Sequence, residues 1–385
     1  MRWTVVIDCA RSAIAKADPA RGYFRDVRAD DLSAALMRAL VERTQLDPRL
    51  IDDVIWGCVQ QQGEQGFNVA RTAALMAGIP PSVPGATVSR NCGSSLQALN
   101  QAVHAIAAGA ADIMLVGGVE HMHHIPMDKD FDPPPKLFRT WSPATFHMGL
   151  IAEYMAVRYK IDRRRQDEFA LRSHRLAAEA REKGLFDREI VPIWGRDENG
   201  EKRLIAQDQG IRPDTTLEAL QALPPAFEPV KGCVTAGNSS QVSVGAAALL
   251  VMAEECAQEL GYKPMARVLG GAVAGVDPGI MGIGPVPATL KALERVGLTL
   301  EQIDVFEINE AFAVQTLAVI DELGIDLDRV NPRGGAIALG HPLGASGARI
   351  ATTLLHTMRD HGYRYGVATM CIGGGQGIAT VFELL

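Results

Sequence analysis

Apolar and polar positions alternate in two rhythms along the chain, and together they predict strands interleaved with helices. Short apolar runs at residues 3–8, 51–59 and 111–120 are typical of buried strands. Residues 68–78 predict a helix, and residues 29–43 predict another with one apolar side, formed by Leu32, Leu36, Met37 and Leu40. Strands and helices that follow one another in this way indicate βαβ units and a largely parallel sheet.

The order of elements in the first third of the chain returns near its C-terminal end. Residues 336–355 predict a strand at "AIAL", a turn and then a helix. From Asp53 to Cys92 is 39 residues and from Asp304 to His341 is 37, and each interval runs from an "ID" pair to a strand-to-helix junction. We interpret this as the duplication of one α/β half-domain, with chance similarity as the alternative.

The middle of the chain breaks this rhythm. Residues 127–146 are rich in proline and lack periodicity, which is typical of a loop, and helical stretches follow at residues 149–160 and 163–184. The charges of the second stretch predict a solvated helix face or, alternatively, arginines beside a phosphate. An insertion of this size would form a lid or a ligand platform. We therefore expect three parts: an N-terminal α/β half (1–120), a loop-and-helix insertion (121–245) and a C-terminal α/β half (246–385).

The composition is that of a folded soluble protein, with 385 residues of which 47% are hydrophobic and 22% charged. A net charge of −7 argues against a general nucleic-acid or anionic-membrane surface. The six cysteines are scattered and form no C-x-x-C pair, so we expect free thiols in a reducing, cytoplasmic compartment rather than disulfides or a structural zinc site. We expect neither a secretory signal nor a run of ~20 apolar residues that would span a membrane.

Four turns carry side chains suited to chemistry, and each follows a predicted strand. They hold Cys92 in "NCGSS", Asn309 in "INEAFA", His341 in "ALGHPLG" and Cys371 in "CIGGGQG". Because parallel α/β sheets bind ligands beyond the carboxyl ends of their strands, we expect these side chains to meet. Cys92 would lie at a helix N-terminus, where the dipole and free N–H groups stabilise a thiolate and hold an oxyanion. The glycines after Cys371 offer further N–H groups for a second oxyanion hole.

Each of these residues also has a purely structural interpretation. Free cysteines are often small buried hydrophobes, so Cys92 and Cys371 could be inert core residues. A lone histidine such as His341 is more often structural than catalytic, although its glycine and proline neighbours favour a fixed turn open to a ligand. Asn309 would then simply cap the helix that follows it.

Longer stretches around these turns resemble the thiolase family over essentially the whole chain. They are "NCGSSLQAL" (91–99), "TAGNSS" (235–240), "NEAFA" (309–313), "NPRGGAIALGHPLGASG" (331–347) and "ATMCIGGGQGIATVFE" (368–383). Residues 56–80 and 116–122 look most like the thiolase subunit of bacterial fatty-acid oxidation complexes. The resemblance implies the thiolase fold, in which two similar βαβαβ-type halves pack in layers with a central loop-and-helix insertion.

The resemblance also implies a role for each candidate residue. Cys92 would take the acyl group, while His341 would activate it and, with a water held by Asn309, stabilise the oxygen of the acetyl-CoA thioester or its enolate. Cys371 would protonate that enolate or deprotonate the incoming coenzyme A thiol, and the N–H groups of Cys92 and Gly373 would form the second oxyanion hole. Four more residues match positions that contact the pantetheine arm of coenzyme A: Ala236, Ser240, His147 and Met148.

The activity implied by this resemblance is thiolysis of 3-ketoacyl-CoA by coenzyme A in fatty-acid β-oxidation, with ping-pong kinetics and no cofactor, since coenzyme A is a substrate. One alternative is a biosynthetic acetyl-CoA acetyltransferase that runs the same steps as a condensation. A ketoacyl synthase of the same fold is disfavoured by Cys371, and a non-catalytic lipid- or partner-binding protein would lack one of the four catalytic residues. The family implies at least a homodimer, and the subunit resemblance suggests a hydratase/dehydrogenase partner.

The chain departs from the family pattern at a few positions. Gln241 stands where a small residue is usual, Val244 where an aspartate is usual and His123 where a glycine is usual. The histidines at 121, 123 and 124 could suggest a metal, but no carboxylate or cysteine accompanies them at ligand spacing. We therefore expect no metal site.

Overall fold

The fold is built around one large mixed sheet. The computed structural model describes residues 2–385. Ten strands form the sheet: β1 (Thr4–Arg11), β2 (Ala15–Lys16), β3 (Asp53–Gly57), β4 (Gly85–Val88), β5 (Ile113–His121), β8 (Ser243–Ala253), β9 (Ala266–Gly275), β10 (Val305–Ile308), β11 (Tyr365–Ile372) and β12 (Gln376–Leu384). A separate hairpin consists of β6 (Ile193–Arg196) and β7 (Lys202–Ile205).

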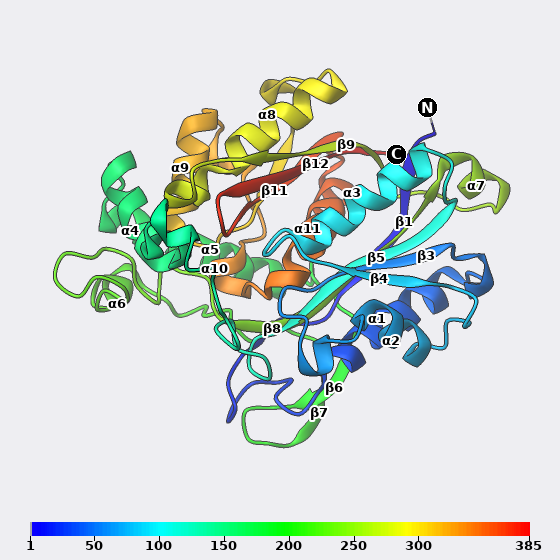
Figure 1. Cartoon of the computed structure of the whole chain (residues 1–385), viewed down its shortest axis with the longest axis horizontal. Coiled ribbons are helices and arrows are strands. Elements are labelled where there is room, and N and C mark those ends of the chain that lie inside the picture. Colours follow the sequence, from blue (N-terminus) through cyan, green and yellow to red (C-terminus); the bar gives the residue numbers. More distant parts are fainter. Residues whose placement is uncertain (1) are drawn as a thin grey trace.

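Helices cover the outer faces of this sheet, and others lie between its two halves (Figure 1). They are α1 (Ala29–Thr44), α2 (Val69–Met76), α3 (Ser94–Ala107), α4 (Met148–Tyr159), α5 (Arg163–Glu182), α6 (Leu217–Gln221), α7 (Glu254–Glu259), α8 (Pro285–Val296), α9 (Ala313–Leu323), α10 (Ala336–Leu339) and α11 (Ser346–His361). The predicted helices at 29–43, 68–78, 149–160 and 163–184 are thus confirmed to within a few residues, and the four apolar residues of α1 are fully buried. Among the described residues, none of these helices is both long and apolar enough to cross a membrane.

Both halves of the chain build their part of the sheet in the same order. The full order is β10-β11-β12-β9-β1-β8-β5-β3-β4, with β2 beside β8. From the middle of the sheet outward, the first half runs β1-β8-β5-β3-β4 and the second half runs β9-β12-β11-β10. The strands β1, β8, β5 and β3 therefore correspond in position to β9, β12, β11 and β10. The third strand is β4 in the first half, whereas the second half keeps only one parallel bridge, between Phe306 and Val330, at that place. The shared order agrees with a duplicated half-domain.

The prediction of a largely parallel sheet is wrong. Only three pairs are parallel, β3 with β4, β3 with β5, and β10 with β11. The last strand of each half, β8 or β12, returns antiparallel between two strands of that half. The sequence does not reveal this reversal because a strand covered on both faces is a continuous apolar run in either direction.

Two aspartates fix the second strand of each half to the fourth. The Asp52 carboxylate accepts hydrogen bonds from two successive backbone N–H groups leading into β5, at 2.6 and 2.9 Å. Asp304 accepts from the two N–H groups leading into β11, at 2.8 and 2.9 Å. The two "ID" pairs therefore have the same structural task, and Asp52, not Asp53, is the equivalent of Asp304.

The elements stack in layers, as the two-halves prediction requires (Figure 1). Helices α1 and α2 cover one outer face, α8 and α9 cover the other, and α3 and α11 lie between the two halves of the sheet. Three apolar clusters fill the spaces between these layers. The central cluster surrounds α3 and α11, and the fully buried side chains that they contribute include Leu96, Leu99, Ile350 and Leu354.

One predicted strand is a helix in the structure. Residues 336–339 form the short helix α10, bounded by Gly335 and by Gly340 at φ +114°. In the second half the sheet ends at the bridge to Val330, so the chain has already left the sheet edge when it reaches "AIAL". Short apolar runs do not distinguish a buried strand from a buried helical turn.

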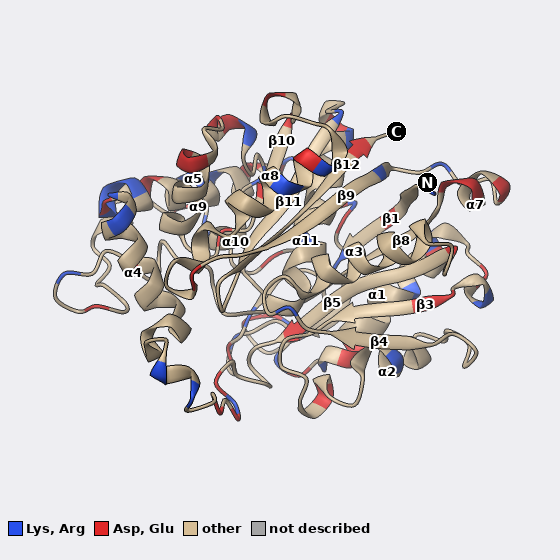
Figure 2. Cartoon of the chain, turned by 45° about the horizontal axis from the view of Figure 1, so that its top comes forward, with Lys and Arg blue, Asp and Glu red and all other residues tan. Residues whose placement is uncertain are grey.

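The insertion lies at one end of the sheet and carries much of the surface charge. Residues 127–146 form turns and short 3-10 segments, as predicted for a loop, and α4 and α5 follow. In Figure 2 the central strands and α3 are almost free of charged residues, whereas α5 carries both signs. Strand β8 begins at Ser243, two residues before the expected end of the insertion at residue 245.

Candidate active site

Cys92 lies in the turn that leads into α3, two residues before the helix begins at Ser94. Asn91 adopts a left-handed backbone (φ +44°), and its side-chain amide donates to the Gly373 carbonyl at 2.9 Å. The turn is therefore fastened to the hairpin between β11 and β12. The backbone N–H groups of Gly373 and of Cys92 itself are near enough to the Cys92 thiol to lower its pKa. These are the two N–H groups expected to form an oxyanion hole.

Burial, not the helix N-terminus, dominates the acidity of Cys92. Burial raises the pKa of the Cys92 thiol, and the N–H groups of Gly373 and Cys92 oppose this only in part. The expectation of a low-pKa thiolate is therefore wrong for the free protein. At neutral pH the resting sulfur is a thiol, and it needs a base to become a nucleophile.

We expect alkylation of Cys92 to follow this raised pKa. The rate of carbamidomethylation by iodoacetamide should rise about tenfold per pH unit between about pH 6 and pH 8.5, because the thiolate fraction keeps growing below the pKa. Peptide mass spectrometry after timed quenching measures the rate at Cys92, and Cys256, a partly exposed thiol in the same digest, is the internal reference. A plateau below pH 7 would contradict the burial argument.

Cys371 lies beside Cys92, at the end of β11. Its side chain is almost fully buried, burial raises the pKa of its thiol, and the nearby Cys92 raises that pKa further. Gly93 packs closely against β11, because a Cβ there would stand 2.6 Å from Ile372 Cδ1. The two cysteines and Gly373 therefore come together as the four-turn hypothesis predicts.

His341 and Asn309 form the second part of the site. Asn309 follows β10 directly, is fully buried, and places its Nδ2 3.4 Å from Nε2 and 3.5 Å from Nδ1 of His341. Its Oδ1 is buried with no hydrogen-bond partner among the described residues, so it can accept from a bound polar group. Burial, together with the nearby Arg349 guanidinium, lowers the pKa of His341 to about 3. The imidazole is therefore neutral at working pH and can accept a proton.

The two central helices bring His341 and Cys92 to the same place. The N–H of Ala348 in α11 donates to the Ser95 Oγ in α3 at 2.9 Å. A Cβ on Gly347 would stand 2.4 Å from the backbone nitrogen of Leu96, so glycine is needed for this contact. Helices α3 and α11 therefore meet at the centre of the molecule (Figure 1), and the turns that precede them hold the candidate residues Cys92 and His341.

Glu120 fixes the histidine turn from the opposite side, and the sequence analysis missed it. This fully buried carboxylate accepts from the backbone N–H of Gly344 (2.8 Å), Val59 (3.0 Å) and Gln60 (3.1 Å), and from the Gln65 side chain (2.9 Å). Burial raises the pKa of Glu120, while these donors lower it. A charged residue near the end of an apolar strand was the available signal, since buried carboxylates are rarely without partners.

The backbone of His341 is held by the segment that leads into β8. Its N–H lies 3.2 Å from Ser243 Oγ and 3.3 Å from the Gln241 carbonyl. The Gln241 amide nitrogen lies 3.1 to 3.3 Å from three carbonyl oxygens, those of Gly210, Ile337 and Ala338. The residue that departs from the family pattern thus ties α10, and with it the histidine turn, to the insertion.

Two of the expected coenzyme A contacts adjoin the catalytic turns. The Ser240 N–H donates at 3.0 Å to the carbonyl of Ala311, two residues beyond Asn309. The Met148 Sδ lies 3.4 Å from the position a Cβ would take on Gly373. Both residues therefore border the site from the insertion.

The other two expected contacts lie farther out. His147 is exposed, and its ring meets the edge of Phe227 at a centroid distance of 6.0 Å. Phe227 in turn meets Phe312 at 6.1 Å, which makes it an apolar wall that the sequence analysis missed. Ala236 is exposed in the turn of residues 235–238, and no described contact joins it to the catalytic side chains.

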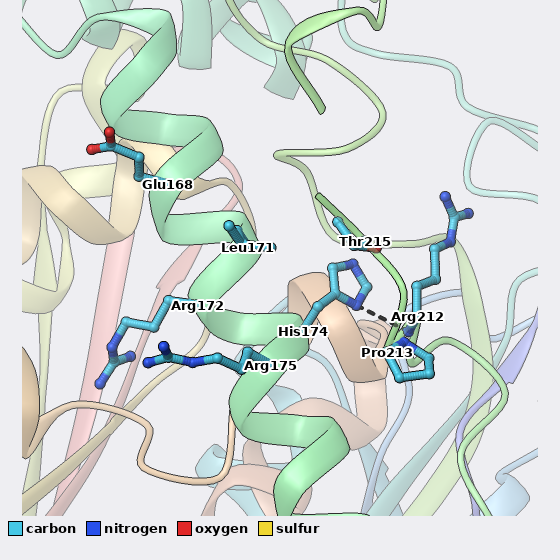
Figure 3. Close-up of a pocket in the computed structure, with 8 residues that line it drawn as sticks. All are labelled: Glu168, Leu171, Arg172, His174, Arg175, Arg212, Pro213 and Thr215. Carbon is cyan, nitrogen blue, oxygen red and sulfur yellow. Dashed lines mark hydrogen bonds between the residues drawn. The ribbon is translucent and has the colours of Figure 1, made fainter. Parts of the chain in front are cut away.

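The arginines of α5 are mostly engaged with protein groups. The first three pair with carboxylates: Arg163 with Asp167, Arg164 with Glu168 and Arg165 with Asp321. Arg172 donates to two backbone carbonyls at 2.8 and 2.9 Å. Arg175, His174 and Arg212 line a cavity of about 420 Å³ between α5 and residues 212–215, where the Arg212 side chain points away from Arg172 and Arg175 (Figure 3). The solvated-face interpretation fits the paired arginines, and phosphate binding stays a prediction.

A carboxylate does accompany the histidine cluster, contrary to the expectation from sequence. Glu64, His121 and His124 place their potential ligand atoms within 4.8 Å of one another. Every ring nitrogen is already hydrogen-bonded, however: His124 to Glu64 (2.9 Å) and the Arg25 carbonyl (2.8 Å), and His121 to the Phe24 carbonyl (3.1 Å) and the His124 N–H (3.0 Å). The cluster therefore joins three loops of the chain.

Comparisons with known proteins agree over the whole length. Residues 4–255 match the family model "Thiolase, N-terminal domain" and residues 262–384 match "Thiolase, C-terminal domain". The 3-ketoacyl-CoA thiolase of Aliivibrio fischeri is 54% identical, and the match covers 100% of this chain and 100% of the relative. The 3-ketoacyl-CoA thiolase of Marinobacter nauticus is also 54% identical, and the match covers 99% of this chain and 98% of the relative. The human mitochondrial 3-ketoacyl-CoA thiolase structure matches with a TM-score of 0.91 at 38% identity, and the Bacillus anthracis acetyl-CoA acetyltransferase structure with 0.90 at 40%; each match covers 100% of this chain and 99% of the other.

Proposed function

This chain belongs to the thiolase family, and from that premise we infer that it is a 3-ketoacyl-CoA thiolase, an acyltransferase that cleaves 3-ketoacyl-CoA with coenzyme A. The observation that carries the proposal is that the free thiols of Cys92 and Cys371 lie near each other beside Gly373, in a chain that is 54% identical over its full length to 3-ketoacyl-CoA thiolases. Cleavage of the C2–C3 bond needs one sulfur to attack the ketone and a second group to protonate the carbanion equivalent that leaves.

The first step makes the nucleophile at the moment of attack. The neutral His341 ring takes the proton from the Cys92 thiol, and the sulfur attacks the C3 carbonyl of the substrate. The N–H groups of Cys92 and Gly373, which face the sulfur at rest, then stabilise the developing oxyanion. Because burial disfavours a free Cys92 thiolate, negative charge does not persist on the sulfur. It develops instead on the substrate oxygen, where these N–H groups donate hydrogen bonds to it.

The second step breaks the C2–C3 bond and leaves the acyl group on Cys92. The departing enolate of acetyl-CoA carries its charge on the thioester oxygen, which the protonated His341 and a water on Asn309 stabilise. Cys371 then protonates C2 of the enolate. Its raised pKa suits this role, because the thiol keeps its proton until a strong base such as an enolate forms beside it.

The last step regenerates the enzyme. The Cys371 thiolate, a strong base for the same reason, takes the proton of the coenzyme A thiol, whose sulfur attacks acyl-Cys92. The shortened acyl-CoA is released, and the leaving Cys92 thiolate takes back the proton that His341 has held since the first step. Ser240, Met148, His147 and Ala236 would hold the pantetheine arm, with the first two nearest the reacting atoms. These steps use only this chain's groups and coenzyme A as a substrate, and we propose that no metal takes part.

A chain-length profile tests the degradative assignment. We expect kcat/KM for thiolysis of 3-ketoacyl-CoA substrates of eight to sixteen carbons to equal or exceed that for acetoacetyl-CoA, within about tenfold, because acyl-chain differences are worth only a few kcal/mol. Magnesium-free spectrophotometric assays of thioester formation measure the profile, and the Cys92→Ala variant gives the background. Activity confined to acetoacetyl-CoA would favour the biosynthetic acetyltransferase, for which the 40% identical Bacillus structure is the nearer analogue.

We further propose that the protein is at least a homodimer. Strand β4 is an open edge of the sheet, and three apolar side chains of the segment packed beside it are exposed: Phe67, Leu75 and Met76. A sheet edge next to exposed apolar groups favours pairing with another chain. A hydratase/dehydrogenase partner subunit and a cytoplasmic location are proposals too; the six free cysteines support the latter.

A further inference from the structure

A buried hydroxyl contacts the catalytic histidine on the side away from the substrate. The Ser346 Oγ, at the first residue of α11, lies 2.6 Å from His341 Nδ1 and 2.8 Å from the Pro342 carbonyl oxygen. Ser346 is 1% exposed and His341 5%. We propose that Ser346 is a positioning residue that fixes the tautomer of His341, with the proton on Nδ1 and the lone pair on Nε2. This inference rests on the proposed thiolase function.

The count of protons at the hydroxyl decides the tautomer. A serine hydroxyl has a single proton, and the Pro342 carbonyl oxygen can only accept a hydrogen bond. The Ser346 O–H therefore donates to Pro342, and its oxygen is left to accept from His341. In a neutral ring the proton is then on Nδ1, and Nε2 is the free base.

No other neighbour of the ring makes this choice. The Asn309 amide nitrogen lies nearly equally far from both ring nitrogens, 3.5 and 3.4 Å, so it does not distinguish between them. Without the serine oxygen, neutral imidazole distributes its proton over both nitrogens. Molecules with the proton on Nε2 would have no base for the Cys92 thiol.

The position of Ser346 is as constrained as its hydrogen bonds. It begins α11 one residue before Gly347, whose missing Cβ lets the helix touch α3. The same helix carries Arg349, which lowers the pKa of His341 and lies 3.6 Å from Glu307. Glu120 in β5 and the thiols of Cys92 and Cys371 are the other titratable groups around the site.

The geometry predicts what loss of the hydroxyl would do. In Ser346→Ala the Nδ1–H loses its acceptor in a dry environment, and part of the population shifts to the wrong tautomer. The proton transfers would slow while coenzyme A contacts stay intact. We expect kcat to fall about 10- to 100-fold with KM within about twofold, and Ser346→Thr to recover most of the loss because it restores the oxygen.

Two measurements test the proposal independently. Steady-state thiolysis gives kcat and KM for the wild type, S346A and S346T. Ser33→Ala is the matched control, because Ser33 is also a buried serine in a helix, α1, and its Oγ also contacts a backbone carbonyl (2.9 Å). The rate of Cys92 alkylation at fixed pH needs no acyl substrate, and it should fall several-fold in S346A and recover in S346T. If the wild type fails to cleave any 3-ketoacyl-CoA while alkylation still depends on Ser346, the proposed function fails and the positioning role stands.

Other outcomes would overturn the positioning role. An S346A protein with wild-type kcat and alkylation rate would show that His341 finds its tautomer without the serine. A rise in KM alone, or an equal loss in S346T at unchanged thermal stability, would assign Ser346 to packing. A loss of stability in S346A no larger than that in S33A, with kcat reduced only in S346A, is the result we expect.

Discussion

Replacing Cys92 with alanine is expected to abolish acyl transfer while leaving coenzyme A binding almost unchanged. The sulfur is the only atom that forms a covalent bond to the acyl group, so kcat/KM for thiolysis should fall by at least about 10⁴-fold. The dissociation constant of coenzyme A should stay within about threefold, because the residues expected to hold its pantetheine arm are on the insertion. Alanine is close in size to cysteine and keeps the turn before α3.

Mass spectrometry makes the test specific for the site. After incubation with acetoacetyl-CoA without coenzyme A, the wild type should carry one acyl group on the peptide that contains Cys92, and the variant none. Cys256→Ser is the control, since that thiol is partly exposed and lies in α7, outside the site. An acyl group on any other residue of the wild type would refute the assignment of Cys92.

Periodicity and turn chemistry were enough to predict most of the architecture. The apolar face of α1 and the strand at β5 follow from local spacing, and the "ID" pairs mark equivalent places in the two halves, where the structure shows that their aspartates join strands. The antiparallel return of β8 and the helix at "AIAL" were missed because both depend on where the rest of the sheet ends. Local sequence does not encode that information.

The candidate residues of the site stay a prediction from sequence, and the structure adds their acidity. Cys92, His341, Asn309 and Cys371 were chosen because each was expected in a turn after a strand and the family resemblance connects them; in the structure His341 follows the helix α10 and Cys371 lies near the end of β11. The prediction of a stabilised thiolate failed because the depth of burial depends on the packing of both halves around α3. A helix N-terminus contributes less than about 1–2 kcal/mol, and removal of a charge from most of its contact with water costs more.

The residues that hold the catalytic groups were the hardest to foresee. Glu120 acts on Gly344, 224 positions away in sequence, and Gln241 acts on Ala338 across 97 positions. Such partners are chosen by the fold, and the only local signal among them is the charge of Glu120 near the end of the apolar strand β5. Ser346 is the exception, since it lies within the same turn as His341 and only its hydrogen bonds reveal its part.

The two cysteines are expected to have separable tasks, and Cys371→Ser should show this. Serine keeps the size of the side chain, but its hydroxyl neither gives up nor takes a proton in the range that the enolate step requires. We expect kcat for thiolysis to fall by about 10³-fold or more, and the exchange of the C2 protons of acetyl-CoA with D₂O to be lost. Alkylation of Cys92 by iodoacetamide should stay within about threefold of wild type, because Cys92 is activated by His341.

The exchange experiment separates the two sulfurs because each variant keeps what the other loses. Proton exchange at C2 needs a base beside the methyl group and donors at the thioester oxygen, so Cys92→Ala should retain it and Cys371→Ser should not. NMR of acetyl-CoA incubated with each variant in D₂O measures the exchange directly. If Cys371→Ser still exchanged these protons at the wild-type rate, another base would have to act there, and His341, which borders the same oxygen, would be the residue to test next.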